Sequence, residues 1–295
     1  MPLHYENLKS HEFPELTQTY TERDSMLYAL GIGMGSDPMD TKQLRFVYEK
    51  NQQAVPTMPV VMTHPGLWPK EPKFGIDWVK VVHGEQWLEV HKPLPPKGRV
   101  RTRMRNTNVI DKGAGKGAIV LHQREMFDDE TGDKLATLAW VLFARGDGGW
   151  LDLPHNQGKQ SDPPLPSLPK TPEDRAPDIV CDLATLPQQA LIYRHNGDWN
   201  PLHVDPDLAR AAQFPRPILQ GLCTYGIACH AILKSLCDYD ASRFGGISVR
   251  FSSPVYPGDT IRTEMWKQND GKIQFRSLAV ERDVVVLNNG VATLR

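Results

Sequence analysis

An internal repeat limits the possible folds of this chain more strongly than any other feature of its sequence. Residues 93–104 read PLPPKGRVRTRM and residues 254–265 read PVYPGDTIRTEM, so the two segments align without a gap. Each follows a segment of alternating apolar and polar residues, at 86–90 and 247–251, and each precedes further strand-like runs. A repeat in the same context indicates two copies of one fold that pack together.

The runs that follow each repeat are typical of β-strands, because they are rich in β-branched and aromatic residues. In the first half they cover 117–127 and 134–144, and in the second half they cover 272–283 and 284–294. We therefore expect each half to end in a set of antiparallel strands.

Helices are expected ahead of the strands in both halves. The segment 218–237 contains no proline and has apolar residues at near-helical spacing. The candidate in the first half, 25–34, is interrupted by Gly31 and Gly33, so this helix should be shorter or bent. A helix followed by an antiparallel sheet predicts an α+β fold in which the sheet wraps the helix.

A proline-rich stretch separates the two halves. Of the 25 prolines, seven lie between Gly146 and Pro177, where no periodic apolar pattern is present. Such a composition is typical of a linker, because proline lacks a backbone donor and fixes φ. The sequence predicts an N-terminal half at 1–146, a linker at 147–178 and a C-terminal half at 179–295.

Composition and charge exclude several classes of protein. The 34 basic and 35 acidic side chains give a net charge of −1, which argues against a dedicated nucleic-acid binder. No apolar run approaches the roughly 18 residues that span a bilayer, and the N-terminus lacks a signal-peptide pattern. The C-terminal ATLR differs from the peroxisomal address S-K-L, so we expect a free-standing cytoplasmic protein. The cysteines form no CxxC pair and are expected to be reduced thiols: Cys181, Cys223, Cys229 and Cys237.

The densest group of polar and turn-forming residues is YRHNGDWNPLHVDPDLARAAQF at 193–214. Its Gly-Asp and Asn-Pro dipeptides predict a tight reversal with Asp198 and His203 on either side. Asp205 should then cap a short helix that runs to Ala212. These residues could build turns and nothing more. A carboxylate, an amide and an imidazole within six residues are also a compact acid/base set that can hold a water.

The long form of this motif, Y-R-x-x-G-D-W-N-P-L-H-x-D-P followed by P-I-L-Q-G-L-C-T-Y-G, resembles the signature of hydratase 2, the (R)-specific 2-enoyl-CoA hydratases of the MaoC-like family. The resemblance extends to HGEQWLEVHKPLPPKG and VIDKGAGKG in the first half and to FSSPVYPGDTIRTEMWK in the second. It implies a double hot-dog fold, with two sheets that each wrap a central helix. The internal repeat agrees with this fold.

The resemblance also implies a role for particular residues. Asp198 and His203 would be the catalytic pair, with Asn200 helping to hold the water between them. The backbone N–H of Gly221, near the start of the predicted helix, would stabilise the enolate oxygen, and the helix dipole favours negative charge there. Gly221 could also serve close packing. The residues implied to contact the acyl-CoA are His83, Gly84, Lys112, Trp199, Pro201, Leu202 and Phe251.

The implied activity is reversible hydration of trans-2-enoyl-CoA to (3R)-3-hydroxyacyl-CoA in β-oxidation or related acyl-CoA metabolism. Residues 1–146 contain no copy of G-D-x-N-P-L-H, so we expect one active site per chain, with the first half forming a pocket for medium or long acyl tails. We expect a homodimer. We also expect no metal or other cofactor, because the sequence shows no metal-ligand spacing and because Gly31–Gly35 and GAGKG at 113–117 lack the spacing of nucleotide-binding loops. The alternatives are a hot-dog acyl-CoA thioesterase and a non-catalytic acyl-CoA-binding protein.

Overall fold

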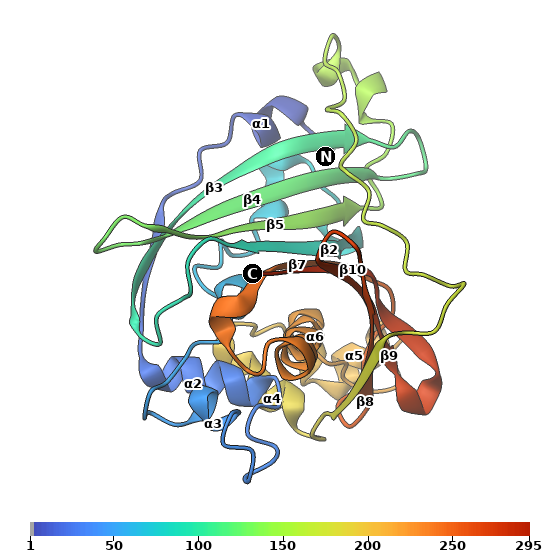
Figure 1. The fold of residues 1–295 in the computed structure, drawn as a ribbon. Helices are drawn as coiled ribbons and strands as arrows, with labels where there is room; N and C mark the ends of the chain where they lie inside the picture. Colours follow the sequence, from blue (N-terminus) through green and yellow to red (C-terminus); the bar gives the residue numbers. More distant parts are fainter. Residues whose placement is uncertain (1–2) are drawn as a thin grey trace.

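The computed structural model describes residues 3–295, and its strands form one antiparallel sheet of ten strands (Figure 1). The strands of the first half are β1 (Leu16–Tyr20), β2 (Val81–Val90), β3 (Gly98–Asp111), β4 (Ala118–Asp128) and β5 (Lys134–Ala144). Those of the second half are β6 (Ile179–Ala184), β7 (Phe244–Phe251), β8 (Thr260–Lys267), β9 (Lys272–Ala279) and β10 (Val284–Leu294). The strands predicted after each repeat are confirmed as β4, β5, β9 and β10.

The order of the strands confirms the internal duplication. The first half reads β1-β3-β4-β5-β2 across the sheet, and the second half continues in the mirrored order β7-β10-β9-β8-β6. The repeated Arg-Thr pairs fall on the equivalent strands β3 and β8, where Thr102 and Thr263 are both fully buried. Strands β2 and β7 pair from Glu85–Arg250 to Glu89–Gly246, so the two halves join edge to edge.

Helix α6 (Gly221–Leu236) is the central helix of the second half, and the strands of that half curve around it (Figure 1). In the first half, α2 (Glu22–Gly31) begins at a Thr21–Asp24 capping box and ends at Gly31, so the prediction of a shorter helix is confirmed. The two helices pack closely at Gly226, where an added Cβ would lie 2.5 Å from the Cγ2 of Ile32. The short helices are α1 (Tyr5–Lys9), α3 (Leu44–Val47), α4 (Gln189–Tyr193) and α5 (Pro206–Ala211).

The inner face of the first half's sheet has two kinds of cover. Near α2 it packs into the main core with residues of both halves. Beyond α2 the covering chain is irregular and contains four 3-10 turns, Met58–Val60, Trp68–Lys70, Pro72–Phe74 and Trp78–Lys80. Trp68 and Phe74 from this segment pack with Trp140 and Trp150 in a second core cluster. The first half therefore has an irregular segment where the second half has a long helix.

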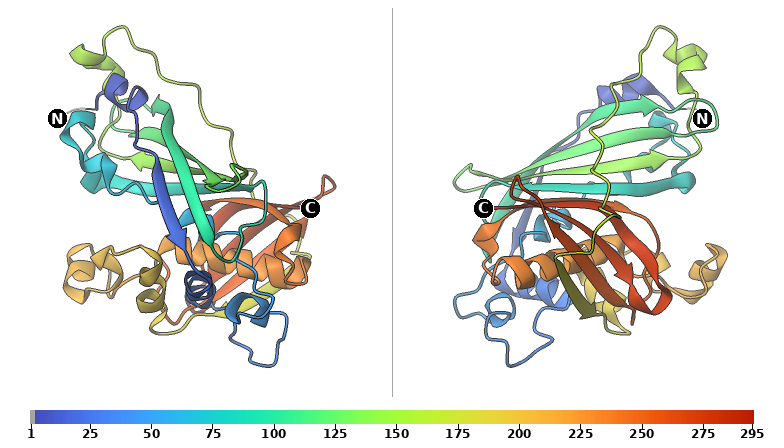
Figure 2. Two further views of the ribbon diagram at one scale, coloured as in Figure 1. Left: turned by 90° about the vertical axis from the view of Figure 1, so that its left-hand side faces the viewer. Right: turned by 45° about the vertical axis from the view of Figure 1, so that its right-hand side comes forward.

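The proline-rich segment 147–178 runs along the outside of the molecule from the first half to the second (Figure 2). It contains no strand, and its regular structure is limited to the 3-10 turns Trp150–Asp152 and Pro154–Asn156. Its first part is attached to the first half, because Asp111 accepts hydrogen bonds from the backbone N–H groups of Gly149 and Leu151. The domain boundaries remain a prediction of the sequence.

Two expectations about cysteines and membranes can be compared with the structure. All four cysteines are buried free thiols, as expected. Within residues 3–295, no helix has both the length and the apolar character that a bilayer crossing requires.

Candidate active site

The Asp198–His203 loop is built by two short turns and the caps between them. Gly197 ends the 3-10 turn Arg194–Asn196 with φ of 110°, a left-handed conformation that favours glycine. Asn200 then begins the turn Pro201–His203, because its Oδ1 accepts a hydrogen bond of 3.1 Å from the N–H of Leu202. Asp198 Oδ1 accepts from the N–H of Asn200 at 3.3 Å. These local bonds return the chain so that His203 lies beside Asp198.

The hydrogen bonds of His203 determine which of its nitrogens can accept a proton. Nδ1 lies 2.9 Å from the carbonyl oxygen of Ile218, and a carbonyl only accepts, so Nδ1 carries the hydrogen. In the neutral imidazole Nε2 then presents a lone pair, and it lies 3.8 Å from Oδ2 of Asp198. This separation is too long for a direct hydrogen bond, and one water can bridge the two acceptors. The His203 side chain is only 9% exposed, whereas that of Asp198 is 31% exposed and reachable from solvent.

The amino end of α6 lies next to this pair. Gln220 is the N-cap residue, and its carbonyl accepts from the N–H groups of Cys223 and Thr224, so the N–H of Gly221 precedes the first hydrogen bond of the helix. Ile218, which binds His203, belongs to the same segment. The acid/base pair and the helix terminus are thus held at a fixed distance. An added Cβ at Gly221 would lie 3.2 Å from the Phe251 ring, so a side chain there would crowd the site.

Strand β2 brings two of the predicted first-half residues to the same place. The β2–β5 register shifts between His83 and Glu85, which places Gly84 in a bulge. An added Cβ at Gly84 would lie 3.2 Å from the backbone oxygen of Val141. The His83 ring lies 4.8 Å from that of Phe251, measured between ring centroids. The structure therefore brings His83, Gly84, Phe251 and Gly221 together from three separate segments.

The remaining predicted residues lie in an exposed turn of the first half or on the rim of the loop. Lys112 is exposed in the turn between β3 and β4, and β5 and β4 separate β3 from β2. GAGKG at 113–117 belongs to this hairpin turn, as expected. Trp199 is 57% exposed, with the Arg194 guanidinium 4.8 Å from its ring. Pro201 is also exposed, and Leu202 is half-buried, so these motif residues form the outer rim of the loop.

Sequence reasoning missed a group of first-half residues around Trp140. The Trp140 ring lies 5.7 Å from the His83 ring and 4.9 Å from both the His64 ring and the Arg124 guanidinium. Desolvation, followed by the positive charge of Arg124, lowers the pKa of His64 to about 4, while the charge of Asp198 acts in the opposite direction. No local motif marks these residues, because strand register and the covering segment assemble them.

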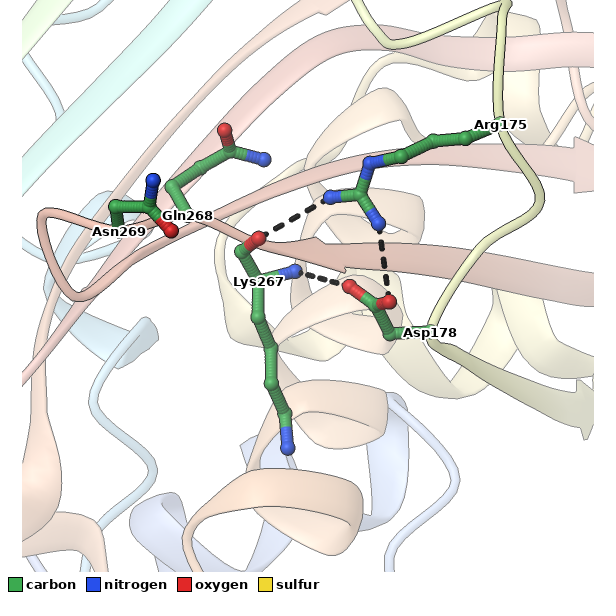
Figure 3. Close-up of a pocket in the computed structure, with 5 residues that line it drawn as sticks. All are labelled: Arg175, Asp178, Lys267, Gln268 and Asn269. Carbon is green, nitrogen blue, oxygen red and sulfur yellow. Dashed lines mark hydrogen bonds and ion pairs between the residues drawn. The ribbon is translucent and has the colours of Figure 1, made fainter.

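A surface hollow lies away from the predicted residues. Figure 3 shows its lining, which consists of Arg175, Asp178, Lys267, Gln268 and Asn269. The carboxylate of Asp178 is already engaged, because it accepts from Arg175 at 3.0 Å and from the backbone N–H of Lys267 at 2.7 Å. These contacts anchor the end of the proline-rich segment to β8, and they leave the Asp198–His203 loop as the candidate active site.

The duplicated sheet, the wrapped helix and the loop at its amino end define a double hot-dog protein. Two family models match the chain, the MFE-2 hydratase 2 N-terminal domain over residues 18–146 and the MaoC like domain over residues 168–289. The chain is 38% identical to the Arabidopsis thaliana protein named enoyl-CoA hydratase 2, peroxisomal, over 95% of this chain and 92% of that protein. The chain therefore belongs to the MaoC-like hydratase 2 family.

Two further comparisons agree with this membership. The chain is 36% identical to mouse peroxisomal multifunctional enzyme type 2 over 96% of its own length, and it spans 38% of that longer protein. It also superposes on the crystal structure of a MaoC-like dehydratase from Phytophthora capsici with a TM-score of 0.84 and 34% identity, covering 98% of both chains. The family resemblance inferred from the motifs is confirmed.

Stability should fall as the pH falls below about 6.5, because buried histidines are neutral in the folded protein. Burial lowers the pKa of His122 to about 3 and that of His230 to about 4, from the usual value of 6.5. At pH values between the lowered pKa of each folded histidine and the usual 6.5 of the unfolded chain, the unfolded chain binds more protons than the folded one. A fall in pH therefore favours unfolding. His122→Phe should make the plot of unfolding free energy against pH shallower by up to one proton, which is about 1.4 kcal/mol per pH unit at the acid end of the range. Urea denaturation at pH values from 7 to 5 measures this slope.

The exposed His195 provides the control, and His195→Gln should leave the slope as in the wild type. The slope is the readout because His122→Phe also leaves the Oδ1 of Asn106 without its partner, which lowers stability at every pH. An unchanged slope in His122→Phe would contradict the prediction.

Proposed function

We propose that this protein is an (R)-specific enoyl-CoA hydratase, a hydro-lyase that reversibly converts trans-2-enoyl-CoA to (3R)-3-hydroxyacyl-CoA in fatty-acid metabolism. The observation that carries the proposal is the 3.8 Å gap between Asp198 Oδ2 and His203 Nε2, beside the amino end of α6. The names of the relatives, enoyl-CoA hydratase 2 among them, support the same reaction.

The proposed chemistry begins with a water that donates one hydrogen to each acceptor of the pair. With both hydrogens so engaged, a lone pair of the water oxygen is directed at C3 of the enoyl group. As the new C–O bond forms, one proton of the water passes to the Asp198–His203 pair, and the π electrons of the double bond move toward the thioester oxygen. The pair then returns a proton to C2, so the elements of water are added and none is left over.

The negative charge that develops on the thioester oxygen needs a donor. In our proposal the backbone N–H of Gly221 supplies it, because this group precedes the hydrogen-bonded part of α6 and benefits from the helix dipole. Asn200 positions the loop through its Oδ1, and its Nδ2 remains as a donor toward the water. The preorganised donors spare the enzyme a reorganisation cost during the reaction.

We assign the acyl-CoA contacts in two groups. His83, Gly84 and Phe251 contact the acyl group, since they lie beside Gly221. Trp199, Pro201 and Leu202 on the rim, together with the distant Lys112, contact the CoA portion. A cytoplasmic location and a homodimeric state remain predictions of the sequence, and gel filtration with light scattering tests the second.

Removal of either member of the catalytic pair should abolish most of the activity. Asp198→Ala and His203→Ala should each lower kcat for enoyl-CoA hydration by at least about a hundredfold, the low end for a positioned acid or base. Because both groups act on one water, the double variant should lose little more than the worse single variant. Loss of absorbance at the enoyl-thioester band measures the rate, and circular dichroism verifies folding.

Asp207→Ala is a matched control for these variants, because Asp207 lies in the neighbouring helix α5 and its side chain is 88% exposed. Activity within a few-fold of the wild type in Asp198→Ala or His203→Ala would show that the assignment is wrong. Release of free thiol in place of the loss of the enoyl band would instead favour a thioesterase.

Hydration should need no metal, because the proposed steps move protons between two side chains and a water. Incubation with EDTA followed by desalting should leave kcat within about twofold of the untreated enzyme, a difference below 0.5 kcal/mol in the barrier. Activity that disappears on chelation and returns with one added metal would overturn this prediction.

The product should be the (3R) alcohol. The groups that handle the water come from one short loop, so oxygen and proton should arrive on the same face of the double bond. This geometry does not set the hand; the (3R) configuration follows from the resemblance to the hydratase 2 family. Chiral chromatography of the product from a medium-chain trans-2-enoyl-CoA determines its configuration. A predominantly (3S) product would contradict the proposed family chemistry even if Asp198 and His203 proved essential.

A further inference from the structure

The inner face of the first half's sheet carries a row of buried polar side chains that the proposed chemistry does not use. Gln86 on β2 pairs with Trp140 on β5, which pairs with His122 on β4, so these three residues lie side by side across the sheet. Arg124 flanks the row on β4, and its guanidinium lies 4.9 Å from the Trp140 ring. Gln86, His122 and Arg124 have no solvent exposure, and Trp140 is only 7% exposed.

We call these four residues, Gln86, His122, Arg124 and Trp140, the polar row. Each of them has a side-chain atom without a hydrogen-bond partner within the described chain. Gln86 Oε1, His122 Nε2, Arg124 Nε and Trp140 Nε1 are all buried and find no hydrogen-bond partner among residues 3–295. The Nε2 of the neighbouring His83 is in the same condition. A buried polar atom without a partner lowers stability, and most such atoms in native proteins are paired. Five of them in one neighbourhood indicate a partner that is not part of the chain.

The polar row continues from the candidate active site. An added Cβ at Gly221 would touch the Phe251 ring, the Phe251 ring lies 4.8 Å from that of His83, and the His83 ring lies 5.7 Å from that of Trp140. The His122 ring is 5.6 Å from Trp140 on the far side. An acyl tail that leaves the Gly221 end of the site toward the first half would therefore meet this row.

The unpaired atoms include both donors and acceptors. Trp140 Nε1 and Arg124 Nε can only donate, and Gln86 Oε1 can only accept. The Nδ2 of Asn106 donates to the carbonyl of Leu8, so its Oδ1 accepts from His122 Nδ1, and His122 Nε2 must then be an acceptor. A plain alkyl tail would leave all of these atoms unpaired. A carboxylate would suit Arg124 but would repel the two acceptors.

We propose that the first half binds an acyl group that carries a hydroxyl on its tail, so that the preferred substrates are hydroxylated trans-2-enoyl-CoA esters. A hydroxyl both donates and accepts, and it pairs with the two kinds of unpaired atom in the row at once. A site built to hydrogen-bond a substrate hydroxyl discriminates strongly against the analogue that lacks it. This inference rests on the proposed hydratase function and names the substrate class of the same site.

The test compares a medium-chain trans-2-enoyl-CoA with counterparts that carry one hydroxyl on successive carbons of the tail. At least one hydroxylated ester should have a kcat/KM about tenfold or more above that of the plain ester, the effect of one well-placed hydrogen bond. Trp140→Phe keeps the ring but removes the N–H donor, and it should lower this ratio at least about fivefold. Calorimetry in the absence of turnover measures the Kd of the same two esters, and the hydroxylated ester should have the lower Kd.

Trp150→Phe is the matched control, because Trp150 is also buried and its Nε1 is also unpaired, but its ring stacks on Tyr5 and it is not part of the polar row. In Trp150→Phe, the ratio of kcat/KM for the hydroxylated ester to kcat/KM for the plain ester should equal that of the wild type. Equal kcat/KM for plain and hydroxylated esters, or an equal fall of the ratio in both variants, would overturn the inference while hydratase activity stands. A preference for an ω-carboxyl ester over every hydroxyl ester would also overturn it. Absence of hydration with all esters would refute the proposed function, and the Kd comparison would then decide the binding preference alone.

Discussion

The pairing of β2 with β7 is the contact on which the rest of this structure depends. It joins two five-stranded halves into one sheet, and the Arg250 guanidinium reinforces it through a 2.8 Å contact with the almost buried Glu85. The bulge at Gly84 turns β2 at the same point, which brings His83 against Phe251 at the end of β7. Because the candidate active-site loop comes from the second half and the polar row from the first, the site that we propose requires both halves.

The second constraint is the hydrogen bond from His203 Nδ1 to the carbonyl of Ile218. One bond performs two tasks, since it selects the tautomer that leaves Nε2 free and ties the loop to the segment that begins α6. A catalytic pair on a loop is usually less well positioned than one on a helix or strand. Here the loop gains rigidity from the local caps at Asn200 and from its attachment to the amino end of the most buried helix in the second half.

Local patterns in the sequence predicted what is local in the structure. The repeat, the strands β4, β5, β9 and β10 and the helix α6 all have strong periodicity, and the Asp198–His203 loop carries its own turn residues. The edge strands β1 and β6 were missed because they are short and lie at the two ends of the sheet, where half of the backbone groups have no strand partner. The polar row was missed for a different reason: Gln86, His122 and Trp140 are far apart in sequence, and only strand register makes them neighbours.

The short helix of the first half and the polar row beside it have a common physical cause. An α-helix pairs most of its own backbone N–H and C=O groups by hydrogen bonds. The irregular segment that covers the sheet beyond α2 does not, so its buried carbonyls need donors from other residues. Arg124 supplies two of them, to the carbonyls of Val60 and Met62, and Thr102 bonds the side chain of Thr63. Polar side chains on the inner face are therefore a requirement of the irregular cover. In our proposal, the donors and acceptors that this cover leaves unpaired beside the seam bind the hydroxyl of a substrate.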